Sequence, residues 1–156
     1  MEVNNTFFHN LIKIAITESL KASLNNDIPV AAIVFKNNTI ISKAHNCTYK
    51  YNDVSLHAEM LAIKKACKKI RTPRLDGFSI FTTLEPCTMC AGAIILAHIE
   101  NIVILTPDLK SGACGSLLSI IPNKLLNHSP SITWLQPNQK YINLLKNFFK
   151  QRRNKK

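Results

Sequence analysis

Two short stretches of the chain carry the side chains best suited to bind a metal ion. His57 is followed by Ala58 and Glu59, and thirty residues after His57 the pair Cys87 and Cys90 is separated by two residues. Cysteines three apart on a helix lie on one face and can bind the same ion. Two thiolates and an imidazole suit Zn²⁺, and three protein ligands leave a fourth tetrahedral position for water. The pattern therefore predicts one catalytic zinc ion per chain.

Other interpretations of these cysteines remain open at this stage. Cys87 and Cys90 are also typical of a redox pair, although such a pair does not require a His-x-Glu motif upstream. A fourth cysteine, Cys47, Cys67 or Cys114, would close the site and make it structural. We expect Cys47 and Cys67 to be buried thiols without a metal, because one ends a predicted strand and the other lies in the apolar stripe of a predicted helix.

Glu59 is the candidate for proton transfer. Zn²⁺ with two thiolates and a neutral histidine carries no net charge, so it acidifies water less than a site of three histidines does. A base near the metal is then needed to take the proton from water. At the first turn of a helix, His57 and Glu59 can both approach a centre beyond the helix end, with Glu59 not itself a ligand.

Regular elements must hold these motifs in place. Hydrophobic periodicity predicts helices at 7–24, 56–70, 87–98 and 138–153, and strands at 29–35, 39–47, 78–82, 101–105 and 131–135. A turn at 36–38 makes the first two strands a hairpin, and 46–55 and 107–115 are expected to be loops. Strands that alternate with helices after a hairpin indicate an α/β fold with three α/β/α layers around a mixed five-stranded sheet. The length of 156 residues fits one domain over 1–156.

Positive charge is concentrated in the last third of the chain. Twenty Lys and Arg against nine Asp and Glu give a net charge of +11, and the segment from Lys110 to Lys156 holds nine basic residues and no acidic one. Such a segment favours a polyanion, nucleic acid before an anionic membrane, and a solvated basic helix at 138–153 is the alternative. No apolar run is long enough to cross a bilayer, and residues 1–5 lack the basic start of a secretory signal. We expect a cytoplasmic protein with reduced cysteines and no membrane contact.

The two motifs resemble those of the zinc-dependent cytidine/deoxycytidylate deaminase superfamily. The stretch Thr83 to Ala93, which reads TLEPCTMCAGA, is similar to the bacterial tRNA adenosine deaminase branch of that superfamily. Further similarities are Pro29-Val30, Asn46, Asp108 with Lys110 and Gly112, Gly115-Ser116-Leu117, and Phe148-Phe149 followed by Arg152-Arg153. Val30-Ala31-Ala32 stands where the family usually has Val-Gly-Ala, and the extra methyl is expected to narrow the pocket wall. His98 stands where the family usually has an arginine.

The resemblance implies a cytidine-deaminase-like fold and hydrolytic deamination of adenosine to inosine at the wobble position of a tRNA anticodon. It implies zinc ligation by His57, Cys87 and Cys90, with Glu59 moving the protons. The implied substrate contacts are Asn46 at the base edge, the Ala58 backbone, a pocket wall of Pro29, Val30 and Leu84, and Asp108 at a neighbouring ribose. The candidates for RNA-backbone contacts are Lys110, Lys150, Arg152 and Arg153.

Some implications of the resemblance have alternatives. Asp108 would, on the other interpretation, cap its own loop. A deaminase of free guanine, cytosine or a nucleoside is the first alternative function, and a non-catalytic zinc module that binds RNA is the second. The resemblance also implies a homodimer, with a tRNA anticodon stem-loop as the substrate.

Overall fold

The computed structural model describes residues 5–154 of the chain. Residues 1–4, which were considered above for a secretory signal, lie outside this range, and so do Lys155 and Lys156 of the basic tail. None of the helices in the described range is both long enough and apolar enough to cross a membrane.

Five strands form one mixed sheet in the order β2-β1-β3-β4-β5. They are β1 (Ala31–Lys36), β2 (Thr39–His45), β3 (Ser79–Thr82), β4 (Asn101–Ile104) and β5 (Ser131–Trp134). β1 pairs antiparallel with both β2 and β3, whereas β3 with β4 and β4 with β5 pair parallel. The strands β2, β3, β4 and β5 therefore run in the same direction, and their carboxyl ends lie on the same side of the sheet.

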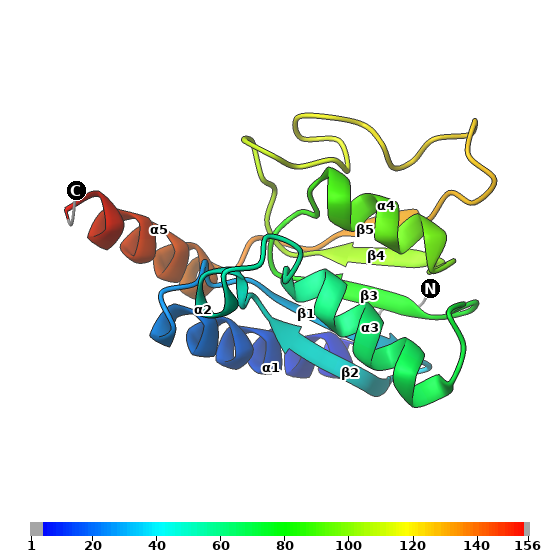
Figure 1. Cartoon of the computed structure of the whole chain (residues 1–156), viewed down its shortest axis with the longest axis horizontal. Helices are drawn as coiled ribbons and strands as arrows, with labels where there is room; N and C mark the ends of the chain where they lie inside the picture. The colour runs from blue at the N-terminus through cyan, green and yellow to red at the C-terminus, as the bar shows by residue number, and fades with distance from the viewer. Residues whose placement is uncertain (1–4, 155–156) are drawn as a thin grey trace.

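Helices cover both faces of this sheet (Figure 1). They are α1 (Asn5–Leu24), α2 (Thr48–Tyr51), α3 (Ala58–Ile70), α4 (Thr88–Leu96) and α5 (Gln139–Arg153). α1 and the start of α5 pack on the face that presents Ile33 and Phe81. α3 and α4 pack on the opposite face, which presents Ile80 and Ile102. The predicted three-layer α/β/α arrangement is confirmed, and α5 projects beyond the sheet.

The predicted hairpin is also confirmed. Asn37 and Asn38 form a two-residue turn between β1 and β2, with φ angles of 46° and 61°. Positive φ at both positions is the geometry of a type I′ turn, which matches the twist of the flanking strands and which asparagine tolerates.

The loop predicted at 46–55 was wrong in part, because it contains the short helix α2. The carboxylate of Asp27, which is fully buried, accepts hydrogen bonds from Thr48 Oγ1 and from the Tyr49 and Lys50 amides, at 2.8, 2.8 and 3.1 Å. It thus binds the free N–H groups at the start of this helix. The contact joins residues more than twenty positions apart, so local sequence patterns could not reveal it.

Two predicted helix limits also need correction. α3 begins at Ala58 because His57 is its N-cap residue, with extended backbone angles. α4 spans Thr88–Leu96 instead of 87–98, because Cys87 is its N-cap and His98 has a φ of 56°. His57 and Cys87 therefore each lie one residue before the helix that follows them.

A buried carboxylate ties α1 to the edge strand β2. Glu18 is 4% exposed, and its carboxylate contacts Lys21 at 2.8 Å, Lys43 at 3.1 Å and His45 Nδ1 at 3.0 Å. Burial by itself raises the pKa of Glu18, but the hydrogen bonds from Lys21, His45 and Lys43 outweigh it and lower the pKa from 4.5 to about 2. The ionised carboxylate therefore stabilises the folded chain above pH 4.5.

Replacing this carboxylate tests its contribution to stability. Glu18→Gln should reduce the free energy of unfolding at neutral pH by about 1–2 kcal/mol, since both lysines are half exposed and solvent screens them. The difference from wild type should shrink as the pH falls from 4.5 towards 2, because the wild-type carboxylate then becomes protonated. Urea unfolding curves measure both effects. Glu100→Gln, at an exposed acid, is the control and should leave stability unchanged.

Candidate active site

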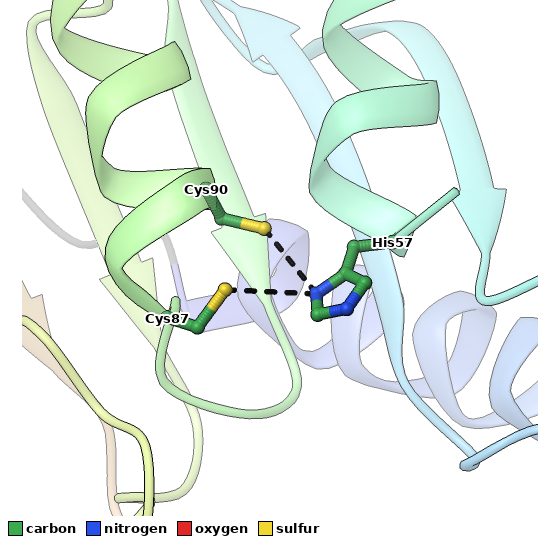
Figure 2. Close-up of side chains that lie close together, drawn as sticks. All are labelled: His57, Cys87 and Cys90. Carbon is green, nitrogen blue, oxygen red and sulfur yellow. Dashed lines mark hydrogen bonds between the residues drawn. The ribbon is translucent and has the colours of Figure 1, made fainter. Parts of the chain in front are cut away.

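Three side chains that could hold a metal ion, His57, Cys87 and Cys90, lie close together (Figure 2). His57 Nδ1 lies 3.7 Å from Cys87 Sγ and 3.6 Å from Cys90 Sγ. All three ligand atoms lie within 4.8 Å of one another. A tetrahedral zinc ion bound at about 2.3 Å to sulfur and about 2.0 Å to nitrogen separates such atoms by roughly 3.5 Å, so the spacing fits zinc.

The course of the strands explains why these residues meet. β2 and β3 run in the same direction, and α3 and α4, which come after them in the chain, pack on the same face of the sheet. His57 is the N-cap of α3, and Cys87 is the N-cap of α4, with Cys90 in the first turn. Neither N-cap side chain makes the usual hydrogen bond to its own helix, so both remain available to a ligand.

The electrostatics of the three groups favour a cation between them. Hydrogen bonding from Cys90, together with the contact to His57, lowers the pKa of Cys87 to about 4 against the effect of burial. The same hydrogen bond with Cys87, together with burial, raises the pKa of Cys90, because two adjacent thiolates repel each other. A divalent cation removes this repulsion, and the donor set of two sulfurs and one nitrogen is the type that zinc prefers.

The other cysteines do not complete this site. Among residues 5–154, only His57, Cys87 and Cys90 form a group that could hold a metal ion. Cys47 and Cys67 are partly buried, so they are less enclosed than expected, while Cys114 is buried and burial raises its pKa to about 12. Three protein ligands leave room for water, as a catalytic zinc site requires.

Glu59 lies in the first turn of α3 and is 3% exposed. Burial raises the pKa of Glu59 from 4.5 to about 7, so its carboxyl group can both take up and release a proton near neutral pH. Within the described part of the chain, its buried Oε2 atom has no hydrogen-bond partner. An unpaired carboxyl oxygen beside three candidate metal ligands is suited to a water molecule or a substrate.

Asn46 and Ala58 are joined by a direct contact. The Ala58 amide donates a 2.8 Å hydrogen bond to Asn46 Oδ1, and both residues are buried. The bond occupies the first N–H of α3 and fixes the Asn46 side chain. Of the described residues, none accepts a hydrogen bond from the Asn46 Nδ2 amide, which leaves that donor for a ligand.

Glu85 was missed as a positioning residue by the sequence analysis. It is 3% exposed, and its carboxylate accepts hydrogen bonds from the Asp108, Cys114 and Ser116 amides at 3.0, 2.8 and 3.1 Å. A Cβ atom at Gly112 would overlap this carboxylate, so only glycine fits there. Glu85 therefore fastens the loop after β4 to the turn that carries Cys87. The sequence feature that could have indicated this role is the position of Glu85 directly before Pro86 and Cys87.

The predicted substrate contacts lie near the site to different degrees. Pro29 and Val30 are buried and Leu84 is partly buried, so their role as a pocket wall stays a prediction. Asp108 caps its own loop, because its carboxylate accepts hydrogen bonds from the Lys110 amide at 2.9 Å and from Ser111 Oγ at 2.6 Å. The capping interpretation is confirmed, and the contact with a ribose stays a prediction.

The expected effect of Ala31 on the pocket was wrong. Its side chain is fully buried in the core cluster between the sheet and α1, on the face opposite α3 and α4. Side chains alternate between the two faces along a strand, so Ala32 and not Ala31 faces the α3 side. The extra methyl group therefore does not narrow the pocket wall.

One hollow has His57 in its lining, and a second hollow lies next to the first, since Tyr49 lines both. The first, of about 410 Å³, is lined by His57, by Ile28 and by residues of the segment 48–54. The other, of about 670 Å³, lies between the start of α2 and the end of α5 and is lined by Lys110, Arg152 and Arg153 among others. Three of the four RNA-backbone candidates thus gather around one hollow, named the basic hollow below. Lys150 is exposed but is not among its lining residues.

Comparison with known proteins identifies the class. The sequence model of the MafB19-like deaminase family matches residues 8–153. A solved structure from work on tRNA:A34 deaminases superimposes with a TM-score of 0.77 at 32% identity, covering 81% of this chain and 91% of that chain. A guanine deaminase from Nitrosomonas europaea gives a TM-score of 0.72 at 23% identity over 87% of this chain and 81% of that chain, which shows the shared fold. The fold and the site thus define a deaminase domain.

Curated relatives narrow the class further. The tRNA-specific adenosine deaminase of Aquifex aeolicus is 40% identical over 92% of this chain and 94% of its own length. The enzyme of the same name from Bacillus subtilis is 37% identical over 93% of this chain and 90% of its own length. The chain belongs to the family of tRNA-specific adenosine deaminases.

The metal content of the purified protein tests the ligand set. The wild type should contain about one zinc ion per chain, measured by plasma mass spectrometry. Cys87→Ala should lose the metal, because two remaining ligands bind zinc far more weakly than three. Cys67→Ser should retain it, since Cys67 lies outside the group of ligands. Full zinc occupancy in Cys87→Ala would contradict the proposed ligands.

Proposed function

We propose that this protein deaminates adenosine to inosine at the wobble position of a tRNA anticodon, with one zinc ion per chain held by His57, Cys87 and Cys90. The proposal is carried by the meeting of these three residues with buried Glu59 at two convergent helix starts. It is supported by relatives at 40% and 37% identity that carry the name tRNA-specific adenosine deaminase.

The residues of the site divide the chemistry among them. A zinc ion held by His57, Cys87 and Cys90 would supply a water molecule activated for attack on C6 of adenine. Glu59 would carry both protons of that water, the first to N1 of the base and the second to the exocyclic amino group, which then leaves as ammonia. The Asn46 Nδ2 amide donates to the edge of the base, while its Oδ1 stays on the Ala58 amide. Adenosine and water are consumed, and inosine and ammonia are released.

The basic hollow provides the contacts with RNA. Lys110, Arg152 and Arg153 line it, and none of the described lining residues is acidic. A wobble adenosine lies in an unpaired loop, so its enzyme must bind the phosphates on either side of the target as well as the base. Lys150 is exposed on the same helix and contributes from outside the hollow.

Two further parts of the proposal concern the setting of the enzyme. The protein acts in the cytoplasm, where tRNA is available, and five free cysteines agree with a reducing compartment. It forms a homodimer, as the resemblance to its family implies.

Product analysis tests the reaction and the role of Glu59 together. The wild type should form inosine from an anticodon stem-loop with a wobble adenosine, as detected by nucleoside analysis after digestion. Glu59→Gln should lower turnover about 10²- to 10⁴-fold while zinc and RNA binding persist, because only proton transfer is removed. Glu100→Gln, an exposed control, should turn over normally.

Each other outcome of that experiment has a definite meaning. Normal turnover by Glu59→Gln would exclude the carboxyl group as the proton carrier, and loss of zinc would make Glu59 a ligand. Guanine, cytosine and free adenosine are assayed beside the stem-loop. Deamination of one of these without inosine in the RNA would favour a free-base or nucleoside deaminase. Binding of the stem-loop without any deamination would favour a zinc module that only binds RNA.

The salt dependence of binding tests the basic hollow. Lys110→Gln and Arg153→Gln should each reduce the slope of log affinity against log salt by about 0.7 if each side chain contacts one phosphate of a single strand. Lys146→Gln is the control, because this lysine is exposed on α5 but lies outside the hollow. Fluorescence anisotropy with a labelled stem-loop gives these slopes. Equal slopes in all three variants and the wild type would leave the basic helix as a solvated surface.

A further inference from the structure

One aromatic side chain lies at the border between the two hollows. Tyr49 lines the hollow that contains His57, and it also lines the basic hollow. Tyr49 is 55% exposed, so its ring is accessible to a ligand. Because Tyr49 lines both hollows, a nucleic acid strand that extends from one hollow to the other would contact its ring.

The ring of Tyr49 is paired with a guanidinium group. The Arg152 Cζ atom lies 3.9 Å from the centroid of the Tyr49 ring and 5.3 Å from that of Phe148. Phe149, which is 40% exposed, also lines the basic hollow. Aromatic rings and guanidinium planes are the surfaces on which proteins stack unpaired bases, and cations beside them bind the phosphates.

The backbone under Tyr49 is held rigidly. Buried Asp27 accepts hydrogen bonds from Thr48 Oγ1 and from the Tyr49 and Lys50 amides, so its charge has three donors. A ring on a fixed backbone loses little conformational entropy when a base stacks on it. The arrangement is therefore organised before any ligand binds.

We propose that Tyr49, together with Arg152, forms a stacking subsite for the unpaired nucleobase next to the target adenosine. This inference rests on the proposed function. A base that is turned into the metal site leaves its neighbour without a stacking partner, at a cost of a few kcal/mol. The Tyr49–Arg152 pair replaces that partner, and because it recognises a π-face it accepts more than one kind of base.

Tyr51 provides a matched comparison on the same helix. It is 60% exposed, and Lys50 Nζ lies 5.1 Å from its ring centroid, so it too is an exposed tyrosine beside a cation. It is not among the residues that line either hollow. A base bound in either hollow can therefore stack on the ring of Tyr49, and Tyr51 serves as a control outside both hollows.

Binding of the anticodon stem-loop by variants tests the subsite. Tyr49→Ala should weaken the affinity about 5- to 150-fold, which corresponds to the loss of one stacked base. Tyr49→Phe should bind within about twofold of wild type, because the ring and not the hydroxyl group is required. Tyr51→Ala should bind like wild type. Zinc content and circular dichroism of each variant check that the fold is intact.

Abasic RNAs show which base is stacked. Two stem-loops carry an abasic nucleotide on the 5′ or the 3′ side of the adenosine. One of them should bind wild type and Tyr49→Ala with equal affinity, because the stacked base is already missing. A Tyr49→Ala loss that persists in full with both abasic RNAs would overturn the proposal. Wild-type affinity in Tyr49→Ala, or a Tyr49→Phe variant as weak as Tyr49→Ala, would overturn it as well.

The same preparations separate this inference from the proposed function. If the wild type forms inosine in the intact stem-loop but the Tyr49 variants give one of the results that would overturn the stacking proposal, only the stacking subsite is excluded and the proposed function stands. If the wild type binds the stem-loop and forms no inosine, the proposed function fails, and the binding comparison still decides whether Tyr49 stacks a base.

Discussion

The common direction of β2 and β3 is the constraint on which the site depends. β1 lies between them and runs antiparallel to both, so the chain leaves β2 and β3 at the same edge of the sheet. The helices that follow pack on the same face, and their starts converge. Without β2, the chain would leave β1 at the opposite end of the strands. His57 would then be separated from Cys87 and Cys90 by the length of a strand.

The two helix starts that converge at the site have backbone N–H groups that need hydrogen-bond acceptors, and neighbouring side chains provide some of these acceptors. An N-cap side chain usually contributes about 1 kcal/mol to a helix, yet both N-cap residues here are metal-ligand candidates without such a bond. Asn46 compensates at α3, since it accepts the Ala58 amide. Glu85 and Asp27 bind backbone amides of the neighbouring segments. Two buried carboxylates and one buried side-chain amide thus accept hydrogen bonds from backbone N–H groups of α2, α3 and the loop after β4.

The sequence predicted what depends on residue type and spacing, and it missed what depends on distant contacts. His57, Cys87 and Cys90 were predicted because few residue types bind zinc, and the hairpin because two asparagines mark its turn. The helix α2 was missed because the cap that stabilises it, Asp27, precedes it by more than twenty residues. The orientation of Ala31 was missed because the face that each strand residue takes is decided by the sheet as a whole.

Glu85 has a consequence for how the loop after β4 can change during evolution. The carboxylate binds three amides of this loop through the main chain, so most side chains there can be replaced without disturbing it. A change in the length of the loop would move those amides and leave a buried charge without partners, which is costly. The contacts of Glu85 thus constrain the length of the loop and the glycine at position 112, so insertions and deletions in this loop are selected against.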